Sequence, residues 1–303
     1  MGLEQTDRNS RDSVCHDDTR RRNTAIRVGT AGWSIPRASA RHFDAGGTHL
    51  WRYSRRLSCA EINSSFYRPH ASATYAKWRD STPPAFRFAV KLPRTITHER
   101  GLAQVREPLV EFLDQTEGLA EKRGPILIQL PPSLVFDESV VTRFFELIRG
   151  LYLGAVVCEP RHATWFTPAA DFLLKTFAVA RAAADPPPVP SAYAPGAWPG
   201  IAYFRLHGSP RKYWSPYSEE FLAALTASIG QVRSADEVWC VFDNTASGAA
   251  AANALELSER LGREASSSDP VPTPLENAQN GSTAPKDAKP SVLRPTRVKV
   301  SEP

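Results

Sequence analysis

The stretch "GAVVCEPRHATWF", residues 154–166, joins a buried strand to a cluster of ionisable side chains. Residues 155–158 are small, apolar or β-branched, which is typical of a strand covered on both faces. Glu159 ends the strand, and Arg161 and His162 follow. Burying such groups is costly unless they are paired or contact a ligand. The stretch therefore predicts a buried strand with an ion network or a functional site at its end.

Strand-like and helix-like stretches alternate along residues 24–261. The strand-like runs are 26–30, 59–63, 86–91, 126–130, 155–159, 178–184, 201–206 and 238–242. Apolar residues at helical spacing mark 48–57, 73–80, 108–122, 138–149, 168–176, 218–232 and 249–261. Eight strands alternating with helices predict an α/β fold, a (β/α)8 TIM-type barrel in one domain. The alternative is an open doubly wound sheet, but "GTAGWS" at Gly29 lacks the glycine spacing of a dinucleotide site.

The two ends of the chain differ from this body in composition. Residues 1–23 are polar and charge-balanced, and residues 262–303 are rich in Ser, Pro, Ala, Asn and Lys. Few large apolar side chains occur in either segment, so we expect both to be disordered. The expected organisation is a disordered N-terminal segment (1–23), a barrel domain (24–261) and a disordered tail (262–303).

Composition narrows the class of protein. The net charge of +5 is mild, and no long Lys/Arg run is present, so a nucleic-acid partner is neither required nor excluded. None of the four cysteines forms a Cys-x-x-Cys pair, which argues against a zinc or disulfide framework. The first 25 residues lack the apolar region of a signal peptide, and no apolar run approaches the roughly 20 residues of a membrane span. We expect a cytoplasmic protein without a membrane partner.

Alternation of side chains along each strand predicts which residues face the barrel interior. In "IAYFRLHG", residues 201–208, Phe204 and Leu206 should meet the helices, and Tyr203, Arg205 and His207 should point inward. The same rule predicts a ring of polar groups at the strand ends: Glu61, Asn63, Lys91, Gln129, Glu159, Asp185, His207 and Asp243. Carboxyl ends of barrel strands carry active sites, so we interpret the ring as a site. The alternative is a buried ion network in which Arg205 only neutralises carboxylates.

Roles follow from the chemistry of these groups. The predicted catalytic residues are Glu61, Lys91, Glu159, His162, Asp185 and His207. The predicted substrate-binding residues are Asn63, Tyr67, His98, Gln129, Arg161, Trp165, Arg205, Arg211, Tyr213 and Asn244. A divalent metal is one expected cofactor, with Glu61, Glu159, Asp185 and Asp243 as candidate ligands, although no His-Glu-x-x-His spacing is present. His98 is a candidate for proton transfer or, alternatively, a helix cap.

A phosphate site is expected where the last two strands end. The stretch "HGSPRKYW" (207–214) supplies Arg211 and Lys212, and "DNTASGAAAANA" (243–254) opens a helix with cap residues and a glycine. Loops at this place, with a helix N-terminus, form the recurrent phosphate site of such barrels. An ordinary helix cap and glycine turn is the alternative.

Eight motifs in order make the chain similar to a known family. They are "GTAGWSIP", "EINSSFY", "FRFAVKLPRTITH", "ILIQLPPS", "EPRHATWF", "ADPPPVP", "YFRLHGSPRKYWSPY" and "FDNTASGAAAANA". Together they resemble the family called domain of unknown function 72, or YecE-like, over about residues 26–261. The resemblance implies a (β/α)8 barrel and a cytoplasmic bacterial protein without an established activity. Family members often read Glu-Phe-Arg-His at 159–162 and Asn-Asn at 243–244, so Pro160 and Asp243 depart from the pattern.

Three functions remain open from sequence. The first is a hydrolase or lyase, with or without a metal, acting on a phosphate-bearing or nucleic-acid substrate. The second is metal-free acid–base chemistry on a sugar or sugar phosphate, with Glu61 and Glu159 as the paired carboxylates. The third is a non-catalytic protein that binds phosphate or nucleic acid with the same residues.

Overall fold

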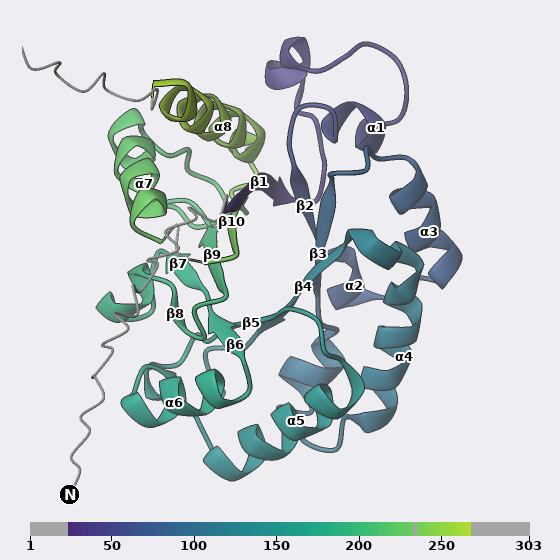
Figure 1. Ribbon diagram of the computed structural model, residues 1–303, viewed down its shortest axis with the longest axis vertical. Coiled ribbons are helices and arrows are strands. Elements are labelled where there is room, and N and C mark those ends of the chain that lie inside the picture. Colours follow the sequence, from purple (N-terminus) through teal and green to yellow (C-terminus); the bar gives the residue numbers. More distant parts are fainter. Residues whose placement is uncertain (1–23, 233–234, 268–303) are drawn as a thin grey trace, which may run out of the picture. The chain divides into compact units, whose positions relative to one another are not determined.

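The computed structural model describes residues 24–232 and 235–267. Ten strands form its sheet, and helices surround them (Figure 1). The strands are β1 (Ala25–Ala31), β2 (Cys59–Ile62), β3 (Arg87–Lys91), β4 (Arg123–Gln129), β5 (Val156–Glu159), β6 (Val179–Arg181), β7 (Ala183–Asp185), β8 (Gly196–Ala197), β9 (Ile201–Leu206) and β10 (Glu237–Phe242). The predicted disordered segment 1–23 and most of the predicted tail 262–303 lie outside the described residues.

The parallel sheet is a barrel, as the alternation of strands and helices predicts. The strand order is β7-β9-β10-β1-β2-β3-β4-β5-β6-β8, and every neighbouring pair is parallel except β6 with β8. The predicted strand 178–184 is split into β6 and β7. β6 pairs with β5 and β7 pairs with β9, so the split strand closes the ring. The short β8 pairs antiparallel with β6 on the edge opposite β5.

The helices follow the strands in the predicted order. The α-helices are α1 (His49–Tyr53), α2 (Ser64–Tyr67), α3 (Ser72–Asp80), α4 (Arg106–Thr116), α5 (Glu138–Leu151), α6 (Pro168–Thr176), α7 (Glu219–Gln231) and α8 (Ala249–Ser267). Shorter helical turns are η1 (Arg37–His42), η2 (Thr95–Glu99), η3 (Glu117–Lys122), η4 (Ala163–Trp165) and η5 (Pro190–Tyr193). No helix within 24–232 and 235–267 is both long and apolar enough to cross a membrane.

Local sequence explains where several helices begin and end. Asp137 caps α5 by accepting from the amides of Ser139 and Val140, and Thr167 caps α6 ahead of Pro168. The predicted helix 108–122 breaks after Thr116 into a 3-10 turn, in which Ala120 has the non-helical angles φ 46° and ψ −126°. Helix α8 runs to Ser267, beyond the predicted domain end at residue 261.

Two apolar clusters confirm the predicted faces of the strands. Phe204 and Leu206 pack in the layer between strands and helices. The second cluster fills the barrel interior and includes Leu127, Val157 and Tyr203. The interior above these apolar side chains is left for the polar ends of the strands.

Glycine is required where the barrel wall is tightest. A Cβ on Gly29 would lie 2.0 Å from the backbone oxygen of Cys59 on the neighbouring strand β2. A Cβ on Gly124 would lie 2.5 Å from the Trp239 ring, which packs in the barrel interior. Any larger residue at position 29 must push two paired strands apart, because the obstacle is backbone.

We therefore expect Gly29→Ala to destabilise the protein by at least about 2 kcal/mol through overpacking. Gly150→Ala is the matched control, because its Cβ would meet nothing within 4 Å in α5. The control should be neutral or stabilising by up to about 1 kcal/mol, since alanine favours helix. Urea unfolding of both variants checks the prediction, and equal effects would contradict it.

Candidate functional site at the barrel mouth

Arg205, on β9, collects three carboxylates at the carboxyl end of the barrel. Its Nε and Nη2 donate to Glu61 on β2, with a shortest distance of 2.7 Å, and its Nη1 donates to Glu159 on β5 at 2.9 Å. Nη2 also lies 3.0 Å from Asp243 Oδ2, directly after β10. Because β2 and β5 are not neighbours of β9, these bonds cross the barrel interior.

His207 is the second connecting residue of this cluster. Its Nδ1 lies 3.0 Å from Asp243 Oδ2, and its Nε2 lies 2.9 Å from Glu159 Oε1. Arg161 Nη2 contacts both His207 Nε2, at 2.6 Å, and Glu159 Oε1. Tyr203 donates to Glu61 Oε2 at 2.8 Å from one layer below. We call Glu61, Glu159, Arg161, Tyr203, Arg205, His207 and Asp243 the Arg205 cluster.

Charge pairing keeps Glu159 and Asp243 ionised. Burial alone would raise the pKa of Glu159, but the guanidinium groups of Arg161 and Arg205 outweigh it and hold this pKa well below its usual value. Burial likewise opposes ionisation of Asp243, and Arg205 and His207 lower its pKa overall. The structure thus contains the buried ion network of the alternative interpretation, in which Arg205 neutralises inward carboxylates.

Most of the cluster is sealed from solvent. Glu61, Glu159 and His207 are 0% exposed, and Arg205 is 1% exposed. Glu61, Glu159 and His207 are three of the six predicted catalytic residues, and a substrate cannot contact them in this conformation. In this state they fix the positions of the side chains bonded to them and contribute to the electrostatic field at the mouth.

Lys91, at the end of β3, is a predicted catalytic residue that lies near the Arg205 cluster but is not ion-paired within it. Its ammonium lies 3.9 Å from the centroid of the Phe66 ring, a cation–π contact. Among residues 24–232 and 235–267, no carboxylate forms an ion pair with it. Burial and the nearby Arg205 guanidinium lower the pKa of Lys91 to about 8. The mouth therefore holds an ammonium that is cationic at neutral pH and close to losing its proton.

Aromatic side chains surround Lys91. Phe66 meets Tyr67 and His98 edge-on, both with ring centroids 4.9 Å apart. Burial and Lys91 lower the pKa of His98, whose Nδ1 lies 2.8 Å from Thr97 Oγ1. The predicted binding residues Tyr67 and His98 are thus brought beside Lys91, and Tyr67 is exposed.

The loop after β9 covers the Arg205 cluster. The ring of Tyr213 lies edge-on to His207 at 5.4 Å between centroids. Burial and Arg161 lower the pKa of Lys212, which places this second amine within the field of the cluster. Arg211, a predicted binding residue, instead stacks on Trp214 at 4.5 Å. Tyr213 and Lys212 are thus the loop residues nearest the site.

After the last two strands, where a phosphate site is expected, two hydrogen-bond donors are already bonded to backbone carbonyl oxygens of the loop after β9. The amide of Ala246 donates to the oxygen of Tyr213 at 3.0 Å, and the Ser247 hydroxyl donates to the oxygen of Trp214 at 2.5 Å. Asn244 is buried and donates to the backbone of Ser215. Carbonyl oxygens before α8 repel an anion, so the alternative of a cap and glycine turn describes this segment.

Asp185 does not join the ring, and the prediction that it points inward is wrong. Its Oδ2 accepts from the Tyr217 hydroxyl at 2.6 Å, and it lines a cavity beside α7. The interior positions are Ala180 and Ala182, whereas Val179, Ala183 and Asp185 share the helix side. Parity counted from Val179 selected the wrong face.

Two further predicted residues serve local structure. Trp165 is fully buried, donates to the Leu134 oxygen at 2.9 Å and packs on Phe136, so it offers no face to a substrate. His162 caps η4 through Nδ1, which accepts from the amide of Thr164. Neither residue contacts the Arg205 cluster in the bonds described.

The remaining predicted amide residues at the strand ends include side-chain oxygens that accept no hydrogen bond from a described residue. Gln129 donates to the adjacent Leu130 oxygen at 2.9 Å. The side-chain oxygens of Asn63 and Asn244 are buried and have no hydrogen-bond partner among the described residues. Arg161 Nε is in the same state. Such orphaned groups are rare in folded proteins and favour a ligand or ordered water at the mouth.

The carboxylates do not fit a divalent metal. Glu61, Glu159 and Asp243 converge on the Arg205 guanidinium, which holds the place a cation would take, and Asp185 lies elsewhere. Within the described ranges, no group of three or more His, Cys, Asp or Glu side chains is arranged to hold a metal ion.

Two tyrosine hydroxyl bonds at the strand ends had no signal in the sequence. Tyr203 was placed inside the barrel by parity, but its hydroxyl bond to Glu61 had no signal in the sequence. Tyr217, which binds Asp185, lies outside any strand, so alternation could not place it.

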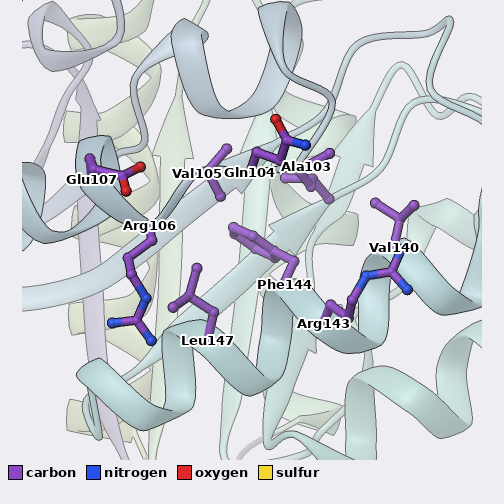
Figure 2. A pocket seen from close by; sticks show the side chains of 10 residues that line it. Ala103, Gln104, Val105, Arg106, Glu107, Val140, Arg143, Phe144 and Leu147 are labelled. Carbon is purple, nitrogen blue, oxygen red and sulfur yellow. The ribbon is translucent and has the colours of Figure 1, made fainter.

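A separate cavity of about 460 Å³ lies between the segment before α4 and the helix α5 (Figure 2). Phe144 and Leu147 line it from α5, and Arg106 and Arg143 flank it. None of the predicted site residues lines this cavity, so it is distinct from the mouth.

Comparisons with known proteins agree with this architecture. A family model described as "Protein of unknown function DUF72" matches residues 27–278. The UPF0759 protein YecE of Escherichia coli K12 is 33% identical over 142 residues, which are 46% of this chain and 50% of that protein. The chain spans about half the length of the curated relatives it matches.

Two solved structures of the same family share the fold. A DUF72 family protein of Enterococcus faecalis superposes with a TM-score of 0.67 at 22% identity, covering 78% of this chain and 95% of that one. One from Thermotoga maritima gives a TM-score of 0.65 at 26% identity, covering 78% and 99%.

The paired carboxylates predict how stability depends on pH. The folded-state pKa of Glu159 lies below its unfolded value, so its contribution is present above about pH 4.5 and is lost as pH falls through the folded pKa. Glu159→Gln should lower the free energy of unfolding at pH 7 and flatten its decline between about pH 5 and pH 3. Urea unfolding across this range tests it; an unchanged slope in the variant would count against an ionised, paired Glu159.

Proposed function

The chain belongs to the DUF72 family, and from its barrel mouth we propose that it is an enzyme acting on a small phosphate-bearing substrate by metal-free acid–base chemistry. The observation that carries the proposal is the Lys91 ammonium, which is buried, has no carboxylate partner among the described residues and has a pKa of about 8. Enzymes tune lysines in this way for proton transfer and anion binding.

The charge pattern supports an anionic substrate. The carboxylates of the Arg205 cluster are already engaged by Arg205, Arg161 and His207. The cations with remaining capacity are Lys91 and Lys212, together with Nε of Arg161. A ligand that enters this mouth therefore meets spare positive charge, which favours a phosphate group.

Lys91 serves in this proposal as anion anchor and proton donor. Its pKa lies above neutral pH, so the amine is mostly protonated there and can donate a proton to a leaving oxygen. The proton released is regained from water, since the pKa is close to neutrality. Glu61, Arg205 and His207 act as positioning residues, because each is bonded within the Arg205 cluster and is at most 1% exposed.

A hydrolase or lyase reaction fits these groups, with a sugar phosphate as the small-substrate case and a nucleic-acid phosphodiester as the larger one. We place the reaction in the cytoplasm, in line with the free, buried thiols of Cys59, Cys158 and Cys240. A non-catalytic phosphate-binding protein is the second candidate, favoured by the complete burial of Glu159 and His207.

The proton affinity of Lys91 can be measured without a substrate. We expect one lysine side-chain NMR signal to titrate with a midpoint of about 8, below the usual lysine value, because burial disfavours the charged amine. Lys91→Met should remove this signal, whereas Lys77→Met, on the exposed face of α3, should not. A Lys91 midpoint near 10.5 would contradict the proposed role.

Turnover separates the enzyme from the binding protein. We expect a panel of sugar phosphates and phosphodiesters to contain a substrate whose hydrolysis or elimination is insensitive to EDTA. Lys91→Met should lower kcat/KM by about 100-fold or more, with Lys77→Met as control. Wild-type activity should decline as pH rises through about 8, because the donor loses its proton. Full activity in Lys91→Met, or loss with EDTA restored by a divalent metal, would overturn the mechanism.

A further inference from the structure

A cavity of about 250 Å³ lies on the same end of the barrel as Lys91. Its walls come from α2, which follows β2, from residues 93–95, which follow β3, and from α4. Segments that follow barrel strands lie at their carboxyl ends, where the mouth is. The cavity is therefore a neighbour of the site.

Phe66 belongs both to the contact of Lys91 and to the wall of this cavity. One face of the ring is in contact with the Lys91 ammonium at 3.9 Å from its centroid, and the same residue lines the cavity. Phe66 is therefore a wall common to the cavity and to the contact of Lys91.

Three arginines line the cavity, and their bonds leave capacity for a ligand. The Arg68 guanidinium has no hydrogen bond or ion pair with any described residue. Arg94 pairs with Glu99 at 3.0 Å, but both side chains are about half exposed, so the pair is weak and exchangeable. Arg100 uses Nη1 for the Gln104 oxygen at 2.7 Å. Its other nitrogens have no partner among the described residues.

Glu111 is the carboxylate on the cavity wall, and it accepts from Gln115 at 2.9 Å. Three guanidinium groups against this one carboxylate leave a net positive lining. Arginine matches phosphate oxygens by paired hydrogen bonds.

We propose that this cavity is the anion subsite of the protein and takes the phosphate or diphosphate group of the substrate, while the reacting part lies at Lys91. This assignment rests on the proposed function. It differs from the usual barrel arrangement, because the segment before α8 is bonded to the carbonyls of Tyr213 and Trp214. The exposed ring of Tyr67 on the cavity wall offers a stacking surface for a flat group beside the phosphate.

Inorganic pyrophosphate is the probe that tests the subsite without turnover. Calorimetric titration of the full chain should show binding that Arg68→Ala/Arg94→Ala weakens by about 100-fold, or about tenfold for each lost charged hydrogen bond. The matched control is Arg41→Ala/Arg263→Ala, which removes two exposed arginines outside the cavity. Glu111→Gln should tighten binding, because it removes the opposing charge.

Lys91→Met separates this inference from the proposed function. Pyrophosphate binding that survives in Lys91→Met but is lost in Arg68→Ala/Arg94→Ala supports the subsite, whatever the turnover assay shows. Loss in Lys91→Met with full binding in the arginine variant would put the anion at Lys91 and overturn the subsite alone. Absence of binding to the wild-type chain at millimolar pyrophosphate would also overturn it.

A short thymidine oligonucleotide, titrated in parallel, identifies the source of the phosphate. Binding of pyrophosphate alone assigns the subsite to a small phosphate ester. Oligonucleotide binding that depends on Arg68 and Arg94 assigns it to a nucleic-acid backbone. Circular dichroism melting of each variant confirms that the fold is retained.

Discussion

The burial of the Arg205 guanidinium is the constraint on which the rest of the structure depends. A charge removed from water must be compensated by close partners, and Arg205 finds them on β2, on β5 and directly after β10. These bonds span the barrel rather than run along its wall. The upper interior is thereby filled by ion pairs, whereas the lower interior is filled by apolar side chains such as Leu127 and Trp239.

This arrangement also decides which groups remain for function. The Glu61 and Glu159 carboxylates that bond Arg205 are fully buried, so they contribute to the electrostatic field of the mouth without contacting a ligand. Lys91 is not ion-paired within this network. Burial and Arg205 lower its pKa, and its ammonium contacts the Phe66 ring. The site thus divides into a network of paired charges and a buried cation without an ion-pair partner among the described residues, and Phe66 separates this cation from the basic cavity.

Sequence alone could predict the barrel and much of the mouth, because strand alternation is a local rule. It placed Glu61, Glu159 and Arg205 correctly, since each sits in an unbroken strand. It failed at Asp185, because parity groups Asp185 with Val179 but does not say which face of this strand meets the helices. Trp165 and His162 follow the strand end in a short turn, where no periodicity indicates direction. The cavity beside Phe66 depends on packing between distant segments, which has no sequence pattern.

A double-mutant cycle between Glu61 and Arg205 tests the central claim most directly. The free energies of unfolding of the wild type, Glu61→Gln, Arg205→Met and the double variant give the coupling between the two side chains. A buried pair that organises the barrel mouth predicts a coupling energy of at least about 1.5 kcal/mol. A coupling within about 0.5 kcal/mol of zero would show that the two side chains act independently and would contradict the account.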